Sequence, residues 1–303
     1  MLASGEQFEI VFGEQVAVIT EVGATLRTYD DGGVAVVEGF GPEAIPDACR
    51  NQVCYPWVNR VGSGEWSFSG RTAKAGADNV VKATLNHGLA RWRAFRLDAR
   101  GEDFCTLSLV LHPTPEFPFL TKFTVTYELG PEGLRVTSRV ENLDDVDVPF
   151  TLGFHPYFAV TTPTIDGATL SIPAASYVRI DERMLPTGEI APVEATALDF
   201  REPALVDGVV LDVTYGDLAR DEAGVFRATL TDANGHAIEV SQDSSFPYFQ
   251  AFSADTLAPG RRRTSLALEP MTAPADALRT GTGRLVLSPG ATWTGAWGVR
   301  RLK

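Results

Sequence analysis

Hydrophobic and polar positions alternate along much of the chain, and a period of two is typical of β-strands with one buried face. Residues 122–129 alternate, residues 130–133 read Gly-Pro-Glu-Gly, and residues 134–142 alternate again. Residues 226–242 repeat this pattern around Asn234-Gly235, a strong signal for a hairpin turn. Both segments are therefore predicted to form antiparallel β-hairpins.

Further apolar runs predict more short strands, at residues 104–112, 284–290 and 292–300. Glycine (28 residues) and proline (19 residues) separate the runs, and only residues 273–279 favour a short helix. Many short strands with few short helices are typical of an all-β sandwich or barrel. Because neither a low-complexity linker nor a repeat of fixed period divides the sequence, we predict a single β domain over residues 1–303.

Composition and charge narrow the possible partners. With 303 residues and 44% hydrophobic residues, the chain can bury a large core. The net charge of -13, from 39 acidic and 26 basic residues, disfavours nucleic acid and anionic membranes as partners. No apolar stretch approaches the roughly 20 residues that span a bilayer, and the first residues lack a secretory signal.

The three cysteines, Cys49, Cys54 and Cys105, form no CxxC pair. This count and spacing disfavour a disulfide framework or a zinc knuckle. Reduced thiols in a cytoplasmic protein are the simplest interpretation.

Histidine is scarce, so each of the four positions can be considered. His155 lies in Gly-Phe-His-Pro-Tyr-Phe, and His87 precedes a glycine that lets the backbone turn and leaves the ring accessible. His112 lies in a proline-rich loop, and His236 follows the Asn-Gly turn, where solvent exposure is expected. A histidine can move a proton near neutral pH, although any one of these could equally be a core residue.

Glu269 is the carboxylate of most interest. It follows the apolar run Leu266–Leu268, which predicts a buried strand that Pro270 is expected to end. A carboxyl at the end of such a strand is partly desolvated, which raises its pKa toward the range of a useful base. The alternative is a glutamate at the sheet rim, paired with one of Arg261–Arg263.

Three further polar residues have two interpretations each. Arg60, between Val58 and Val61, either binds a ligand oxygen or satisfies a buried carboxylate. Asp212 follows an apolar run, where most aspartates form turns. Gln250 either contacts a ligand or faces solvent from a strand.

These motifs occur in an order that resembles the aldose 1-epimerase (galactose mutarotase) family, and its bacterial branch in particular. The segments that carry the resemblance are NRVGSGEWSFSG (59–70), NHGLARW (86–92), GFHPYF (153–158), FQAFSAD (249–255) and LEPMTAPADAL (268–278). The resemblance covers nearly the whole chain. It implies a large antiparallel β-sandwich, the so-called supersandwich, with an open sugar cleft and neither a metal nor an organic cofactor.

The resemblance also implies roles for single residues. The general base falls on Glu269 and the general acid on His155, which is expected to be protonated at rest. The sugar-binding positions fall on Arg60, His87, Asp212 and Gln250, with Asp217 as a rival for Asp212. The implied function is that of an aldose 1-epimerase, an isomerase that interconverts sugar anomers by opening and reclosing the ring.

Other functions and several details stay open. A hexose-6-phosphate epimerase of the same fold would need a basic subsite, for which Arg71, Arg91 and Arg93 are candidates. A non-catalytic sugar-binding protein or sensor would have the sugar cleft but would not carry out the reaction. A monomer and a homodimer are both compatible with the sequence. The aromatic residue that packs on the sugar ring is one of Trp57, Trp66, Phe246 and Tyr248.

Overall fold

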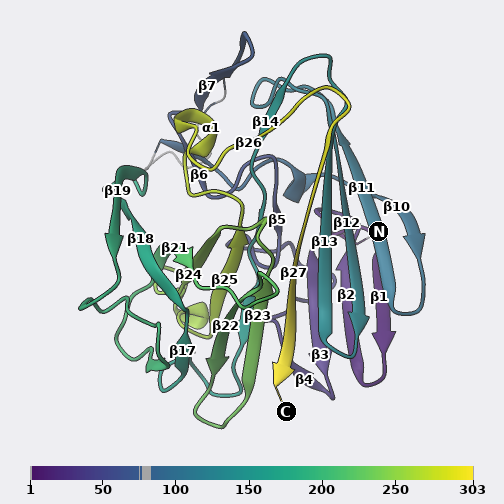
Figure 1. The fold of residues 1–303 in the computed structure, drawn as a ribbon. Coiled ribbons are helices and arrows are strands. Elements are labelled where there is room, and N and C mark those ends of the chain that lie inside the picture. Colours follow the sequence, from purple (N-terminus) through teal and green to yellow (C-terminus); the bar gives the residue numbers. More distant parts are fainter. Residues whose placement is uncertain (1, 75, 77–82, 303) are drawn as a thin grey trace.

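Two large antiparallel sheets form the molecule in the computed structural model, which describes residues 2–74, 76 and 83–302 (Figure 1). The larger sheet contains, in spatial order, β10 (Arg96–Arg100), β11 (Phe104–Leu111), β12 (Thr121–Gly130), β13 (Gly133–Asn142), β27 (Thr292–Leu302), β23 (Ala237–Gln242), β22 (Phe226–Thr231), β17 (Thr169–Ser171) and β20 (Ala204–Leu205). The second sheet contains β19 (Pro186–Pro192), β18 (Ala174–Ile180), β21 (Asp212–Leu218), β24 (Tyr248–Phe252), β25 (Ser265–Met271), β15 (Gly153–Phe154) and β5 (Val53–Cys54), and β16 (Tyr157–Ala159) also pairs with β25.

Smaller elements cover the ends and sides of these sheets. An N-terminal sheet contains β1 (Gln7–Phe12), β2 (Gln15–Thr20), β3 (Leu26–Asp31) and β4 (Val34–Ala35). Two-stranded ribbons pair β6 (Arg60–Gly62) with β9 (Thr84–Asn86), β7 (Glu65–Phe68) with β8 (Arg71–Lys74), and β14 (Val148–Phe150) with β26 (Leu285–Leu287). The helical elements are α1 (Ala277–Thr280) and the 3-10 turns η1 (Ala90–Trp92) and η2 (Pro259–Arg261).

The predicted all-β sandwich is confirmed, and so are both hairpins. β12 pairs with β13 from Thr121↔Asn142 to Gly130↔Gly133, and β22 pairs with β23 from Phe226↔Gln242 onward. Strand β12 buries every second side chain, as its alternating sequence requires. The predicted strands at 104–112, 284–290 and 292–300 correspond to β11, β26 and β27.

The predicted helix over residues 273–279 is reduced to the single turn α1. Asp276 has a left-handed backbone (φ 62°), which is incompatible with a continuous right-handed helix across this position. Its buried carboxylate accepts a hydrogen bond from the Gly62 amide and pairs with Arg279. Asp276 therefore holds this segment against β6 through its side chain. Its left-handed backbone keeps the helix short.

Aromatic side chains of the two large sheets meet in one hydrophobic core. Phe154 contacts Trp297 with ring centroids 5.3 Å apart, and Phe226 contacts Phe249 at 5.0 Å. Strand β25 lies deep in this arrangement, and all seven of its residues are buried. The expectation that Pro270 ends the strand is wrong, because β25 continues to Met271 and Pro270 pairs with Phe249.

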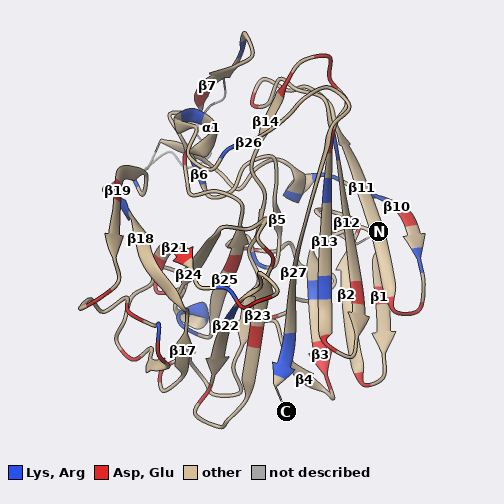
Figure 2. Ribbon diagram, in the orientation of Figure 1, with Lys and Arg blue, Asp and Glu red and all other residues tan. Residues whose placement is uncertain are grey.

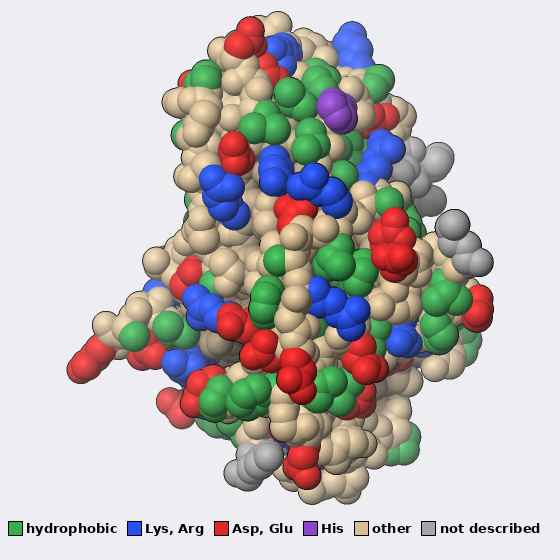
Figure 3. Space-filling view, turned by 90° about the vertical axis from the view of Figure 1, so that its right-hand side faces the viewer, with side chains coloured by type: hydrophobic (Ala, Val, Ile, Leu, Met, Phe, Trp, Pro, Cys, Tyr) green, Lys and Arg blue, Asp and Glu red, His purple; other side chains and the backbone are tan. Residues whose placement is uncertain are grey.

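The surface carries charges of both signs. Acidic and basic residues are interspersed over the sheets and loops (Figure 2), and they alternate with apolar side chains on the face drawn in Figure 3. Across the described ranges, no helix has the length and apolar character needed to cross a membrane.

Candidate active site

A pocket of about 180 Å³ opens over the second sheet and brings all six sequence-predicted residues together. It is lined by Ala48, Cys49, Asn59, Arg60, Asn86, His87, His155, Tyr157, Asp212, Gln250, Phe252, Leu257 and Glu269. These residues come from distant parts of the sequence, so the fold, not any local motif, assembles them. We call this set the candidate pocket.

Strand register places His155 opposite Glu269. On one side of β25, Gly153 pairs with Met271 and Tyr157 pairs with Ala267, so the segment between them passes residue 269. The Leu268 amide donates to the Pro156 carbonyl, so the nitrogen of Pro270 points to the same side, where its missing N–H is tolerated. The chain around His155 is held further by backbone hydrogen bonds with Asn51 and Gln52.

The two side chains form a close, buried pair. His155 Nε2 lies 3.4 Å from Glu269 Oε1, and these residues are 6% and 3% exposed. Tyr157 stacks on the imidazole at 5.1 Å with an interplanar angle of 17°, and Phe252 meets its edge. Nδ1 of His155 is buried and has no hydrogen-bond partner among the described residues. The pair is therefore shielded from water on most sides.

Burial shifts both pKa values toward the uncharged forms. The pKa of His155 is lowered to about 3, mainly by desolvation, with a smaller contribution from the charges of Arg91 and Arg60, while a backbone hydrogen bond opposes this shift. Desolvation raises the pKa of Glu269 well above its usual range, Asp212 raises it further, and Arg60 opposes this rise. The expectation of a raised Glu269 pKa agrees with this direction, whereas the expectation that His155 is protonated at rest does not.

Arg60 and His87 reach the pocket from the β6–β9 ribbon, in which Arg60 pairs with Asn86. Arg60 Nη1 donates to Asn59 Oδ1 at 2.9 Å. His87 follows the ribbon with a left-handed backbone (φ 54°), and Gly88 continues the turn (φ 72°). A Cβ at residue 88 would lie 2.2 Å from the Tyr55 carbonyl oxygen, so this turn requires glycine.

Cys54 contacts the ring of His87 from behind. Its Sγ lies 3.3 Å from His87 Nδ1. Burial raises the pKa of the Cys54 thiol and lowers the pKa of His87, so both groups are uncharged. A thiol donor at Nδ1 requires the proton of the ring to be on Nε2.

Asp212 and Gln250 are the polar residues that line the pocket next to Glu269. Gln250 is the cross-strand partner of Glu269, and its Nε2 donates to Asp212 Oδ1 at 2.6 Å. Burial raises the pKa of Asp212, while the Arg60 charge and the Gln250 hydrogen bond lower it. Gln250 is 3% exposed, so the interpretation as a solvent-facing strand residue is wrong.

Three more polar residues that were considered from the sequence make their contacts outside the candidate pocket. Arg261 pairs with Glu38 and Asp47, so it does not hold Glu269 at the sheet rim. Asp217 accepts a hydrogen bond from Ser176 Oγ at 2.7 Å and does not line the candidate pocket. His236, expected to be exposed, is buried next to Asp232, whose carboxylate accepts its backbone N–H.

The aromatic walls are Tyr157 and Phe252, not the four aromatic residues considered from the sequence. Trp57, Trp66 and Phe246 are buried in the core, and Tyr248 lies outside the lining. Phe252 could have been recognised from alternation, because it lies two residues after Gln250 and therefore on the same face of β24. Cys49 and Leu257 carry no comparable sequence signal.

Of the three arginines considered for phosphate, one lies beside the candidate pocket. Arg91 Nη1 contacts Cys49 Sγ at 2.9 Å, and Nη2 donates to the Asn86 carbonyl at 3.0 Å. Arg71 instead pairs with Asp144, with Nη1 at 2.6 Å from Oδ2. Arg93 is exposed after η1 and does not line the pocket.

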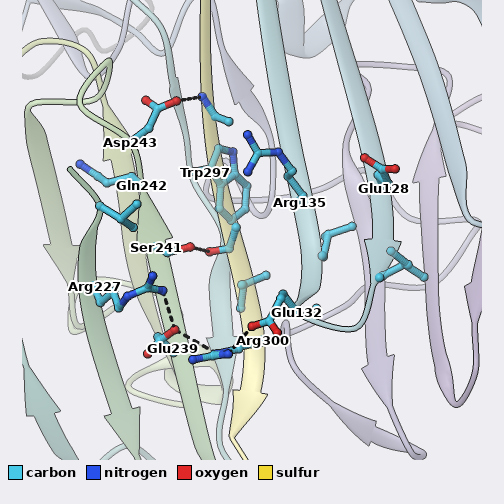
Figure 4. A pocket seen from close by; sticks show the side chains of 18 of the residues that line it. Glu128, Glu132, Arg135, Arg227, Glu239, Ser241, Gln242, Asp243, Trp297 and Arg300 are labelled. Carbon is cyan, nitrogen blue, oxygen red and sulfur yellow. Dashed lines mark hydrogen bonds and ion pairs between the residues drawn. The ribbon is translucent and has the colours of Figure 1, made fainter. Parts of the chain in front are cut away.

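A wider hollow of about 360 Å³ lies on the larger sheet, and its lining includes Arg227, Glu239 and Arg300 (Figure 4). Arg227 and Arg300 both pair with Glu239 there, so these charges compensate one another. Its lining includes none of the six sequence-predicted residues, and the His155–Glu269 pair belongs to the smaller pocket. Among the described residues, no three His, Cys, Asp or Glu side chains are grouped to hold a metal ion.

Comparison with known proteins finds relatives of the same fold. The uncharacterized protein YihR of Escherichia coli K12 is 28% identical over 96% of this chain and 91% of the relative. Maltose epimerase of Levilactobacillus brevis is 27% identical over 91% and 88%, and human galactose mutarotase is 37% identical over 48% and 43%. A solved aldose epimerase homologue from C. elegans superimposes with a TM-score of 0.84 at 19% identity, covering 98% and 99% of the two chains. The family model for aldose 1-epimerase matches residues 7–299, and the chain therefore belongs to the aldose 1-epimerase family.

Proposed function

We propose that the protein is a mutarotase that interconverts the α and β anomers of a free cyclic aldose. The observation that carries the proposal is the buried pair of His155 Nε2 and Glu269 Oε1, 3.4 Å apart beside a pocket of about 180 Å³. Opening a sugar ring requires a base at the C1 hydroxyl and an acid at the ring oxygen. A carboxylate and an imidazole that face one small pocket meet this requirement.

In the opening step, the Glu269 carboxylate takes the proton of the C1 hydroxyl, and the C1–O5 bond breaks as C1 becomes an aldehyde. Protonated His155 gives its Nε2 proton to the ring oxygen. Rotation about C1–C2 turns the other face of the aldehyde toward O5. Closure then uses neutral His155 as the base and protonated Glu269 as the acid, so the step restores both groups and no proton is gained or lost.

Burial makes the uncharged arrangement the resting one, so opening in this direction first requires the single proton of the pair to pass from Glu269 to His155, across the 3.4 Å between Oε1 and Nε2. The pair holds one proton in both arrangements, with charges before opening and without charges after it. Burial disfavours the charged arrangement, since it raises the pKa of Glu269 and lowers that of His155. Opening from the charged arrangement removes two buried charges, which offsets the free-energy cost of forming that arrangement.

The other pocket residues suit sugar hydroxyls. Arg60 donates only, Asp212 accepts when ionised, and His87 presents an Nε2–H donor when its Nδ1 accepts from the Cys54 thiol. Tyr157 and Phe252 supply apolar walls for the ring carbons. A neutral polyol needs several such convergent partners, because each hydroxyl loses its water on binding.

Polarimetry of freshly dissolved α-D-glucose and α-D-galactose tests the proposal. We expect the wild type to accelerate the approach to anomeric equilibrium, and Glu269→Gln and His155→Asn each to lose about 10²–10⁴-fold of the catalysed rate. Glu43→Gln, an exposed glutamate on a loop, is the matched control. Folded variants that keep the wild-type rate would contradict both assigned roles.

Activity on a sugar phosphate is a second candidate, favoured by the position of Arg91 beside the pocket. The same assay with glucose 6-phosphate separates the two substrates. If Arg91 binds a phosphate, Arg91→Met lowers kcat/KM for glucose 6-phosphate and leaves glucose unchanged. An equal loss on both sugars would instead assign Arg91 to the support of Cys49 and Asn86.

A further inference from the structure

Three hydrogen-bonded side chains lie in a row below the candidate pocket. Thr214 Oγ1 contacts Gln250 Oε1 at 2.5 Å, and Gln250 Nε2 contacts Asp212 Oδ1 at 2.6 Å. Thr214 and Gln250 are cross-strand partners on β21 and β24, and they are 7% and 3% exposed. Asp212 and Gln250 line the pocket, whereas Thr214 lies behind them.

Charge fixes the direction of these hydrogen bonds. An ionised carboxylate can only accept, so the amide nitrogen of Gln250 must face Asp212. The amide oxygen then faces Thr214, whose hydroxyl must donate to it. The row thus runs in one direction, from Thr214 through Gln250 to Asp212.

We propose that Thr214 is a positioning residue of the reaction: it locks the amide of Gln250 so that Gln250 holds the Asp212 carboxylate in place beside the sugar. The inference rests on the proposed mutarotase function and deepens it. Gln250 uses its amide oxygen and one N–H within the protein, which leaves one N–H for a sugar hydroxyl. Its main task is therefore to support Asp212.

The row also connects to the proton-transfer pair. Asp212 is, after burial, the largest cause of the raised pKa of Glu269, and Arg60 opposes it. The other titratable groups around this region are His155 and His87, both uncharged, the buried thiol of Cys54, the pocket residues Cys49 and Tyr157, and Arg91 beside them. If the Gln250 amide turns, Asp212 loses a donor and is protonated more readily, and Glu269 then loses a negative neighbour.

Thr214→Val removes the donor and keeps the shape of the side chain. We expect kcat/KM to fall about tenfold, the typical effect of one buried hydrogen bond, and the alkaline limb of the pH–rate profile to move to lower pH. Thr214→Ser keeps the hydroxyl and should retain both the wild-type rate and the wild-type profile. Thr20→Val is the control, because Thr20 is fully buried in β2 and its hydroxyl donates to the Val22 carbonyl.

A double-mutant cycle distinguishes positioning from packing. If Thr214 acts through Gln250, Thr214→Val costs nothing further in a Gln250→Leu background. Any of three results would overturn the proposal. The losses of kcat/KM could add fully in the double variant, the pH–rate profile of Thr214→Val could stay unshifted, or Thr214→Ser could lose as much kcat/KM as Thr214→Val. Thr214→Ala takes the place of the valine variant if that variant does not fold.

A readout without catalysis separates this inference from the proposed function. Carbon-13 NMR titration of the Asp212 carboxyl should show a higher pKa in Thr214→Val than in the wild type. This result would support the positioning role even if the wild type were inactive on every sugar, which alone would overturn the mutarotase proposal. An unchanged Asp212 titration would overturn the positioning role even if the wild type were active.

Discussion

Glu269 places a carboxyl group on a strand that is buried along its whole length. Each buried charge costs free energy unless it is well paired, and the partner of Glu269 in the pocket is the His155 imidazole at 3.4 Å, which burial keeps uncharged. The folded-state pKa of Glu269 lies well above 4.5. This group therefore favours the folded state below pH 4.5, where it is protonated in both states, and this contribution is lost as the pH rises through the folded-state pKa.

Glu269→Gln should consequently stabilise the protein at alkaline pH. The amide keeps the shape and cannot ionise, so its gain over the wild type should be larger at pH 9 than at pH 5. Each 1 kcal/mol recovered raises Tm by about 2 °C for a protein of this size. Scanning calorimetry at both pH values measures the difference, and an equal Tm change at the two values would contradict it.

The same pair predicts the pH dependence of the reaction. A second proton binds the pair only near pH 3, because burial lowers the pKa of His155 to about 3. The single proton leaves only above the raised pKa of Glu269. The profile of kcat/KM against pH should thus be a broad plateau across neutral pH whose limbs belong to the pair and not to either residue. A narrow optimum centred near pH 6.5 would contradict this assignment.

At the scale of elements, the turn after β9 determines where His87 lies. It combines a left-handed His87 with Gly88, whose backbone packs against the Tyr55 carbonyl, and that carbonyl accepts two hydrogen bonds, from the amides of Leu89 and Ala90. No other residue type fits at position 88 without moving this backbone.

Gly88→Ala should therefore destabilise the protein in two ways, through backbone strain and through the clash of the new Cβ with the Tyr55 carbonyl. Its cost should be much larger than that of a glycine replacement that introduces backbone strain alone. Gly224 is the matched control, since its φ of 77° is similar to the 72° of Gly88 and nothing lies within 4 Å of its added Cβ. We expect Gly224→Ala to cost about 1–2 kcal/mol and Gly88→Ala at least twice as much. Denaturant titration of both variants measures this, and equal costs would show that the turn can shift.

Strands can be predicted from the sequence where their own alternation of buried and exposed side chains defines them. The prediction fails where contacts with distant segments determine how far a strand extends. Alternation alone predicts β12, β13, β22 and β23, because each buries one face. The residue pattern does not predict that β25 continues through Pro270, since that depends on how the segment around His155 passes beside it. The six site residues come from a family resemblance, and the shift of His155, His87 and Glu269 toward their uncharged forms comes from a burial that no local pattern encodes.

At the scale of the whole molecule, the candidate pocket draws on strands, turns and loops that all contact one core. β6, β9, β15, β21, β24 and β25 contribute its polar residues or the turns that carry them. Backbone pairing holds the segment around His155 beside Glu269, so the two backbones cannot separate without breaking the second sheet.

Thermal loss of activity should accordingly coincide with global unfolding. Residual mutarotation measured after brief heating and tryptophan fluorescence of the same samples should give one transition with a common midpoint. The core tryptophans Trp57, Trp66 and Trp297 report the loss of packing. Activity that disappears several degrees before the fluorescence change would show that the pocket opens as a separate unit.

The enclosure of the His155–Glu269 pair has a consequence for the fate of the transferred hydrogen. With solvent kept away on most sides and a short path between the two groups, a proton taken from the sugar can return to the same sugar without mixing with bulk water. The protein would then transfer protons only between itself and the bound sugar, without exchange with the solvent. Its turnover would be independent of buffer concentration, even though every catalytic event moves two protons.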